Sequence, residues 1–197
     1  IDSEHSTPPE NEDGEYKIIK TQNVKNGQIV SEQCKNASNE VYEEWTTRGE
    51  PKSGDLVVTR EAPAGRVGIV DDEYQYLLGQ RTVLLRPNTE RVTTEYLNIY
   101  LQSLMFDWWS SLKSQGSTVD HVNISDLKDL PVVLPPQKQQ QEIVSETSDV
   151  LETITDLDDK RTKLAKLVEE KRKSLVTAAV TGQIDMSKEK DVIQGDD

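Results

Sequence analysis

Three short polar segments hold side chains whose types and spacing could read the edges of DNA bases. The first is Thr59-Arg60-Glu61 with Arg66, the second is Gln80-Arg81, and the third runs from 116 to 123. Arginine can fork onto guanine, glutamine and asparagine onto adenine, and glutamate can accept from cytosine, whereas serine and threonine suit phosphates. The candidate DNA contacts are therefore Thr59, Arg60, Glu61, Arg66, Gln80, Arg81, Ser117, Thr118, His121 and Asn123.

Each segment also has a plainer interpretation, which is favoured when the segment is taken singly. Arg60 and Glu61 could form a surface ion pair, Gln80-Arg81 could begin an exposed strand, and the residues after Gly116 could simply follow a helix end. The usage of arginine is what stands out, because residues 48–91 contain six arginines and one lysine. The planar guanidinium fork matches phosphates and guanine edges better than an ammonium group does.

Other kinds of chemistry have little support in the sequence. It contains no GxxxxGK[ST] phosphate loop, no GxGxxG fingerprint and no cysteine–histidine set with metal-ligand spacing. The two histidines, His5 and His121, are far apart, and Cys34 is a single cysteine without a motif. We therefore expect no catalytic residues, no metal and no cofactor within this chain.

The composition indicates a chain with much exposed surface. Of its 197 residues 34% are hydrophobic and 30% are charged, and the net charge is -13. That charge argues against nonspecific attraction to nucleic acid. No run of about 18 apolar residues could span a membrane, and a lone cysteine fits a reducing cytoplasm. The start at Ile1, without a leader-like segment, suggests a fragment or a processed chain.

The elements that must position the candidate contacts are mostly strands up to residue 86. Residues 16–30 resemble two short strands around Asn26-Gly27, a strong hairpin signal. A short helix is expected within 31–47. The apolar runs LVVT and GRVGIV predict two strands that must break at Pro63 between them. Further strands are expected at 74–78 and 82–86 because of their β-branched and aromatic residues.

The pattern changes to helix after Pro87. Apolar residues recur at helical spacing through 93–115, which predicts an amphipathic helix capped by Thr94, ended by Gly116 and packed with its aromatic residues in the core. A turn at SDLKDL and a strand stopped by Pro135-Pro136 are expected to follow.

A long helix is predicted beyond the prolines, because residues 139–179 contain no proline or glycine. In a heptad register starting at 143, eight of eleven core positions are apolar, and the other three are Thr147, Arg161 and Lys171. A helix of about 40 residues is about 60 Å long and needs a partner helix, from a missing part of the chain or from a second chain. The expected pairing residues are Ile143, Val150, Ile154, Leu157, Leu164, Val168 and Leu175.

Together these patterns predict an α+β fold, with a β-rich globular domain followed by a long coiled-coil helix. The expected boundaries are 1–136 for the globular domain, 137–181 for the helix and 182–197 for an acidic tail without regular structure.

The order of the motifs resembles the specificity subunit of type I restriction–modification systems. The segments that carry the resemblance are DSEHSTPP, YKIIKTQNVKNGQIV, EPKSGDLVVTREAPAGRVGIV, LLGQRTVLLRP, TEYLNIYLQS, GSTVDHVNISDLKDLPVVLPP with QQQEIV, and EKRKSLVTAAVTGQID. The sequence departs from the family pattern in three ways. The strand usual before DSEHSTPP is expected to be absent, Lys138-Gln139 stands where Glu-Gln usually follows the prolines, and the acidic charge is unusual for a DNA reader.

The resemblance implies a subunit without catalysis of its own. Its target recognition domain would read one half of a split double-stranded DNA site, and its spacer helix would pair with another. One such unit implies a half subunit or the C-terminal half of a full one, so a homodimer or a pairing with a missing N-terminal half is expected. Methyltransferase subunits would dock on it and restriction subunits would join the complex, with S-adenosylmethionine, ATP and Mg²⁺ bound by those partners.

Two alternatives remain open from the sequence. The chain could be a coiled-coil scaffold that only assembles partners, without DNA readout of its own. It could also be the recognition domain of a fused restriction–methylation enzyme.

Overall fold

The computed structural model describes residues 1–3, 6–104, 106, 109 and 121–183. The chain divides into two compact units, Ile1–Thr147 and Ser148–Asp197, and each is described by itself. Nearly all of the second unit's described residues belong to the long helix α5 (Gln137–Val180), which begins in the first unit. The predicted acidic tail falls almost entirely on residues 184–197, outside the described residues.

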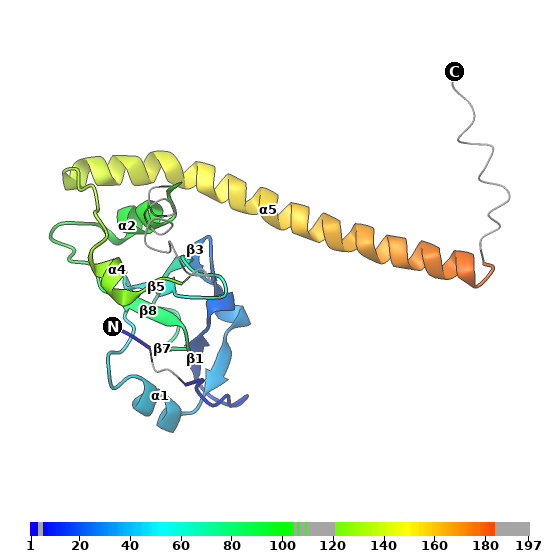
Figure 1. The fold of residues 1–197 in the computed structure, drawn as a ribbon, viewed down its shortest axis with the longest axis horizontal. Coiled ribbons are helices and arrows are strands. Elements are labelled where there is room, and N and C mark those ends of the chain that lie inside the picture. The colour runs from blue at the N-terminus through cyan, green and yellow to red at the C-terminus, as the bar shows by residue number, and fades with distance from the viewer. Residues whose placement is uncertain (4–5, 105, 107–108, 110–120, 184–197) are drawn as a thin grey trace, which may run out of the picture. The chain divides into compact units, whose positions relative to one another are not determined.

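Two β-sheets form the first unit (Figure 1). One has five strands in the order β2-β3-β6-β5-β8, and the other has three in the order β4-β1-β7. Both are mixed, because β3 pairs parallel with β6 and β1 pairs parallel with β7, while the other pairs are antiparallel. The strands are β1 (Tyr16–Ile19), β2 (Val24–Lys25), β3 (Gly27–Ile29), β4 (Lys35–Ala37), β5 (Leu56–Thr59), β6 (Val67–Ile69), β7 (Tyr76–Leu78) and β8 (Thr82–Leu85).

The Asn26-Gly27 turn forms as predicted, with a difference in its partners. Val24 lies opposite Ile29 across the turn, and both turn residues have positive φ, 49° for Asn26 and 79° for Gly27. The turn therefore joins β2 to β3. The earlier strand β1 does not take part in this hairpin. It lies in the other sheet, separated from β2 by the 3-10 turn η1 (Thr21–Asn23).

Three apolar clusters hold the layers together, and β5 shows how. Val57 packs with Ile19 and Tyr76 in a cluster shared by strands of both sheets. Its neighbours Leu56 and Val58 point to the opposite face, into a second cluster. Successive side chains of a strand alternate between faces. All three are fully buried because an apolar cluster lies on each face. The five-stranded sheet is thus covered on both sides.

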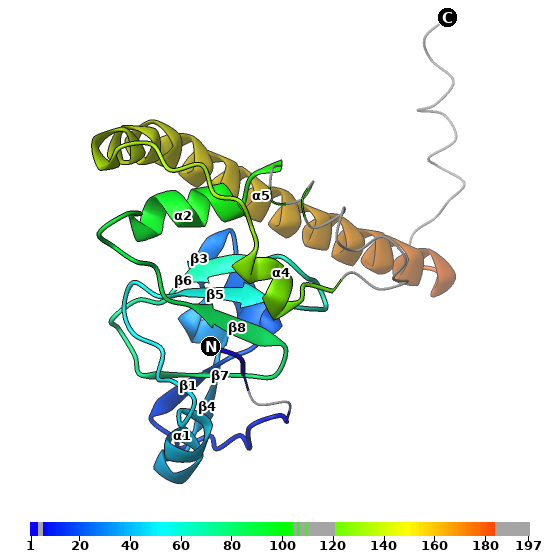
Figure 2. The same ribbon diagram turned by 60° about the vertical axis from the view of Figure 1, so that its left-hand side comes forward.

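Short helices cover the outer faces of the two sheets (Figure 2). The predicted helix within 31–47 is α1 (Asn39–Trp45), which packs on the three-stranded sheet. Helices α2 (Thr94–Leu101) and α4 (Ile124–Lys128) contribute Leu101 and Leu127 to the cluster on the five-stranded sheet. A second 3-10 turn, η2 (Ser31–Gln33), precedes β4, and close to it Cys34 is buried, which raises the pKa of its thiol to about 12.

Helix α2 is shorter than the sequence predicted, since it ends at Leu101 rather than near 115. Its cap is also one residue earlier. Thr93 accepts a hydrogen bond from the backbone N–H of Tyr96, whereas the hydroxyl of Thr94 donates to the carbonyl of Gly54 at 2.9 Å. The predicted end at Gly116 lies outside the described residues.

The strand predicted before Pro135-Pro136 is wrong. Residues 131–136 have no regular structure, and aromatic hydroxyl groups take up two carbonyls of this segment. Tyr96 donates to Val133 at 2.8 Å and Tyr100 donates to Pro131 at 2.7 Å. Prolines on either side of the apolar run remove the donors that a sheet ladder needs.

The start of α5 is fixed by a buried glutamine, Gln140. Its amide nitrogen donates to the carbonyls of Arg91 at 3.0 Å and Pro135 at 2.8 Å, and its amide oxygen accepts from the N–H of Thr93 at 2.8 Å. The side chain therefore connects α5 to the N-terminal end of α2, entirely through backbone groups.

The remainder of α5 extends to Val180, as predicted. The seven predicted pairing residues are exposed by fractions from 36% for Ile143 to 60% for Leu164. Arg161 pairs with Asp158 of its own helix at 2.7 Å. Whether the stripe of apolar residues pairs with another helix stays a prediction. No helix in the described part of the chain has the length and apolar character needed to cross a membrane.

Replacing Gln140 by alanine should lower the free energy of unfolding by about 2–4 kcal/mol, because three backbone groups lose their hydrogen bonds to a buried side chain. Urea unfolding followed by circular dichroism measures this. The matched control is Gln141→Ala, since Gln141 is exposed on the next position of the same helix. Equal stability of the two variants would contradict the role assigned to Gln140.

Candidate functional site

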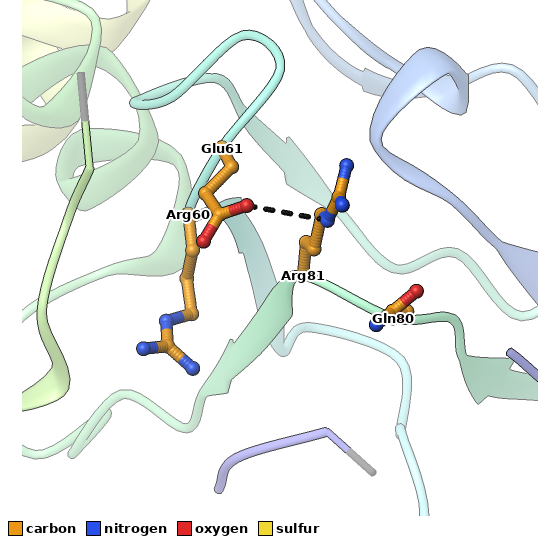
Figure 3. Close-up of a pocket in the computed structure, with 4 residues that line it drawn as sticks. All are labelled: Arg60, Glu61, Gln80 and Arg81. Atoms are coloured by element: carbon orange, nitrogen blue, oxygen red, sulfur yellow. Dashed lines mark ion pairs between the residues drawn. The ribbon is translucent and has the colours of Figure 1, made fainter. Parts of the chain in front are cut away.

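Two of the three polar segments meet where β5 pairs with β8. Thr59 lies opposite Thr82 in the register, and one step further the backbone N–H of Arg60 donates to the carbonyl of Arg81 at 2.8 Å. Arg60-Glu61 and Gln80-Arg81 thereby line one pocket of about 240 Å³ (Figure 3). The sequence separates these two pairs of residues by about twenty positions, and the antiparallel ladder brings them together.

Thr59 is part of the scaffold of this site. It is fully buried, its hydroxyl donates to the carbonyl of Pro63 at 2.6 Å, and it accepts from the N–H of Arg66 at 3.0 Å. The carbonyl of Thr59 accepts from Gly65, whose φ of 81° suits glycine. Thr59 thus closes the loop between β5 and β6 from inside, and a contact of its side chain with DNA stays a prediction.

Glu61 stands at the centre of the site and joins the second and third polar segments. One carboxylate oxygen, Oε2, lies 3.2 Å from Nε of Arg81, and the other, Oε1, lies 2.9 Å from Nδ1 of His121. The plainer interpretation, a surface pair between Glu61 and its neighbour Arg60, is not what forms. The partners of Glu61 come from the residue directly before β8 and from the segment before α4.

Arg60 is held on all sides and only 16% of its side chain is exposed. Its guanidinium lies 3.2 Å from Asp2, donates from Nε to the carbonyl of Val122 at 3.3 Å, and lies 3.1 Å from Nε2 of His121. A guanidinium can only donate, so Nε2 of His121 accepts and Nδ1 carries the hydrogen donated to Glu61. Arg60 therefore braces the histidine that holds Glu61.

The other candidate contacts are more scattered. Arg66 is exposed on the loop between β5 and β6, and Asn123 is exposed at the start of α4, where its amide donates to Asp126 at 3.0 Å. Ser117 and Thr118 lie outside the described residues. The structure thus brings together Arg60, Glu61, Gln80, Arg81 and His121.

A second hollow adjoins the first, and the sequence analysis did not identify its other residues. It has a volume of about 270 Å³, shares Gln80 and Arg81 with the first pocket, and is otherwise lined by Thr7, Lys20, Thr21 and Gln22. Thr7 donates to Gln80 at 3.2 Å. The sequence did contain a signal for these residues, the polar segment TQN shortly after an apolar strand. The interpretation of 16–30 as a hairpin treated it as part of the hairpin.

Comparison with known proteins gives a consistent family. The family model for the type I restriction modification DNA specificity domain matches residues 4–167. The EcoBI specificity subunit of Escherichia coli is 24% identical over 127 residues, which cover 64% of this chain and 27% of that subunit. A putative type I specificity subunit of Haemophilus influenzae, S.HindORF215P, is 29% identical over 119 residues, covering 60% and 29%. The matched region thus spans less than a third of either relative.

Two solved structures share the fold. One, from work on complex assembly and conformational transition of the type I restriction–modification system, has a TM-score of 0.58 and 19% identity over 92% of this chain and 44% of that one. The HsdS subunit from Thermoanaerobacter tengcongensis has a TM-score of 0.55 and 20% identity over 78% and 40%. These similarities confirm the predicted α+β fold with a long C-terminal helix.

Arg60→Ala should lower the free energy of unfolding by about 1–3 kcal/mol, since it removes the guanidinium contacts to Asp2, the Val122 carbonyl and His121. Thermal unfolding compares it with Arg66→Ala, which removes an exposed arginine from the same loop and should change stability by at most about 0.5 kcal/mol. A large loss in Arg66→Ala together with none in Arg60→Ala would reverse the assignment of the bracing residue.

Proposed function

We propose a function for this chain from one premise: the chain belongs to the type I restriction–modification DNA specificity family. The proposed function is sequence-specific recognition of double-stranded DNA by the first unit, which reads one half of a split site. The match of the family model over 164 residues, 4–167, carries the proposal. The relatives are named as specificity subunits, in agreement with the expectation of a chain without catalysis of its own.

The polar surface at the ends of β5 and β8 supports DNA reading. Both hollows that meet at Arg81 are lined by side chains with hydrogen-bonding groups, among them two arginines, a lysine and two glutamines. Arginine and glutamine are the side chains that pair in a bidentate manner with guanine and adenine edges. Sequence reading of this kind depends on a few placed groups, so a chain with a net charge of -13 can still carry it.

The exposed apolar stripe on α5 supports the second part of the proposal, assembly through helix pairing. Residues such as Leu157 and Leu164 recur at heptad spacing and are more than half exposed in the chain by itself. We propose that a second helix covers them, from another copy or from a further part of the subunit. Methyltransferase subunits would then dock on the paired assembly and supply S-adenosylmethionine chemistry, and restriction subunits would supply ATP- and Mg²⁺-dependent cleavage.

Co-expression with the methyltransferase subunit from the same source tests the recognition function. Mapping of methylated adenines in the host DNA should reveal a split motif, which should be palindromic if two copies of this chain pair with each other. The methyltransferase subunit expressed alone is the control and should leave no motif. A stable complex that methylates no defined sequence would contradict the proposal and favour the scaffold alternative.

Leu164→Glu should weaken self-pairing of the full chain at least about tenfold, because a charge enters the apolar seam. Sedimentation analysis over a range of concentrations measures the change. Lys163→Glu, one position away and outside the predicted seam, is the control and should pair nearly as the unmodified chain does. If the unmodified chain is a monomer at all concentrations, the partner helix comes from elsewhere and self-pairing is wrong.

A further inference from the structure

We propose that Arg81 reads a guanine through the major groove and that Glu61 is the residue that positions it. This inference rests on the proposed function, DNA recognition by the first unit, and names the base and the pair of residues for one part of the surface. It differs from the expectation that Arg60 and Glu61 both face the DNA.

The backbone at Arg81 indicates that the side chain, and not the turn, is what this position requires. Its φ is 70°, in the left-handed region that glycine adopts without cost and a long side chain adopts at some expense. Neighbouring residues fix the turn itself. The hydroxyl of Thr82 donates to the carbonyl of Gly79 at 2.7 Å, and the backbone N–H of Arg60 donates to the carbonyl of Arg81 at 2.8 Å. A strained residue held by well-bonded surroundings is a mark of functional sites.

The hold of Glu61 on Arg81 leaves the correct edge of the guanidinium available. Glu61 contacts Nε at 3.2 Å, while half of the Arg81 side chain is exposed. The guanidinium edge formed by the two terminal nitrogens is separate from Nε, and two parallel N–H donors on one edge match O6 and N7 of guanine. Figure 3 shows the guanidinium groups of Arg60 and Arg81 directed away from each other, with the Glu61 carboxylate between the two side chains.

A series of contacts fixes the orientation of the Glu61 side chain. His121 holds its other oxygen at 2.9 Å, and Arg60 holds His121 at 3.1 Å. Arg60 is in turn anchored to Asp2 and to a backbone carbonyl. Because both of its oxygens are held, Glu61 keeps the guanidinium of Arg81 in one orientation before DNA binds. Less conformational entropy is then lost when Arg81 contacts a base.

The same carboxylate is what favours a base over a phosphate as the ligand of Arg81. A phosphate at the terminal nitrogens would lie close to the negative charge of Glu61, whereas a guanine edge is neutral and offers two acceptors. The neighbour Gln80, which lines the same two hollows, is also a residue type that reads base edges. An arginine whose charge is paired with a carboxylate, next to a side-chain amide, suits the reading of a base edge.

The test uses the complex of the full chain with its methyltransferase subunit and a randomised DNA duplex library, followed by sequencing of the bound fraction. The unmodified complex should select a motif that contains a guanine which Arg81→Gly no longer selects. Affinity for the selected duplex should fall about 10- to 100-fold in Arg81→Gly, as for the loss of a bidentate base contact. Replacing that guanine by 7-deazaguanine, which lacks N7, should weaken the unmodified complex and leave Arg81→Gly unaffected.

Three variants separate the assigned roles. Arg81→Gly should keep the urea unfolding midpoint of the unmodified chain, because glycine accepts the positive φ, so its loss of selection is not a loss of folding. Glu61→Gln should weaken guanine selection partly, and should cause no additional loss when combined with Arg81→Gly. Arg91→Ala removes an exposed arginine outside the site and should leave the motif and the affinity as they are.

The outcomes distinguish this inference from the proposed function. If the unmodified complex selects a motif and Arg81→Gly selects the same one, the guanine assignment is wrong while DNA recognition stands. A different outcome is that Arg81→Gly loses the same factor of affinity for every duplex, has a shallower salt dependence and does not respond to 7-deazaguanine. Arg81 then contacts a phosphate, and the guanine assignment is also wrong. If the unmodified complex selects nothing, the recognition function itself fails, and the assignment fails with it.

Discussion

The pairing of β5 with β8 is the constraint on which the proposed recognition surface, Arg60, Glu61, Gln80, Arg81 and His121, depends. Thr59 and Thr82 face each other at the end of this ladder, and both are fully buried with their hydroxyl groups bonded to carbonyls of the adjoining loops. A slip of one residue in the register would turn every side chain of β8 to the other face of the sheet. The two buried threonines hold the register where the loops depart, so Arg60 and Arg81 always leave the sheet side by side.

From that fixed point the two arginines take up different tasks. Arg60 is turned inward and satisfied by three partners, whereas Arg81 is half exposed and held by one of its nitrogens. The distinction lies in the number of contacts, since the residue type is the same. Glu61 compensates part of the charge of Arg81, and in the proposed site it also orients the guanidinium. Placement of a few charges thus matters more here than the net charge.

Local signals in the sequence predicted the elements that local chemistry controls. The Asn26-Gly27 turn, the break at Pro63 and the helix from 137 to 180 formed as expected because glycine, proline and heptad spacing act within a few residues. The assignment of β1 to the second sheet could not be predicted, because its parallel partner β7 lies almost sixty residues away. The same holds for the apolar run before Pro135, whose carbonyls are bonded by tyrosine hydroxyls of α2.

The candidate site shows the same division. The polar segments could be identified by residue type, but their roles followed from non-local contacts. Thr59 is buried, and Glu61 contacts a histidine from a distant segment as well as Arg81, which neither residue type nor spacing could indicate. The η1 residues that line the adjoining hollow belong to a stretch that looked like an ordinary hairpin.

The joint at Gln140 has a consequence for how such a chain can change over time. All three partners of this side chain are backbone groups, which every residue type provides except the N–H missing from proline. Side chains elsewhere in the globular unit can therefore change without removing the partners of Gln140. Because Gln140 bonds only to main-chain groups, the same joint between helix and globular unit is compatible with globular units of different sequence and specificity.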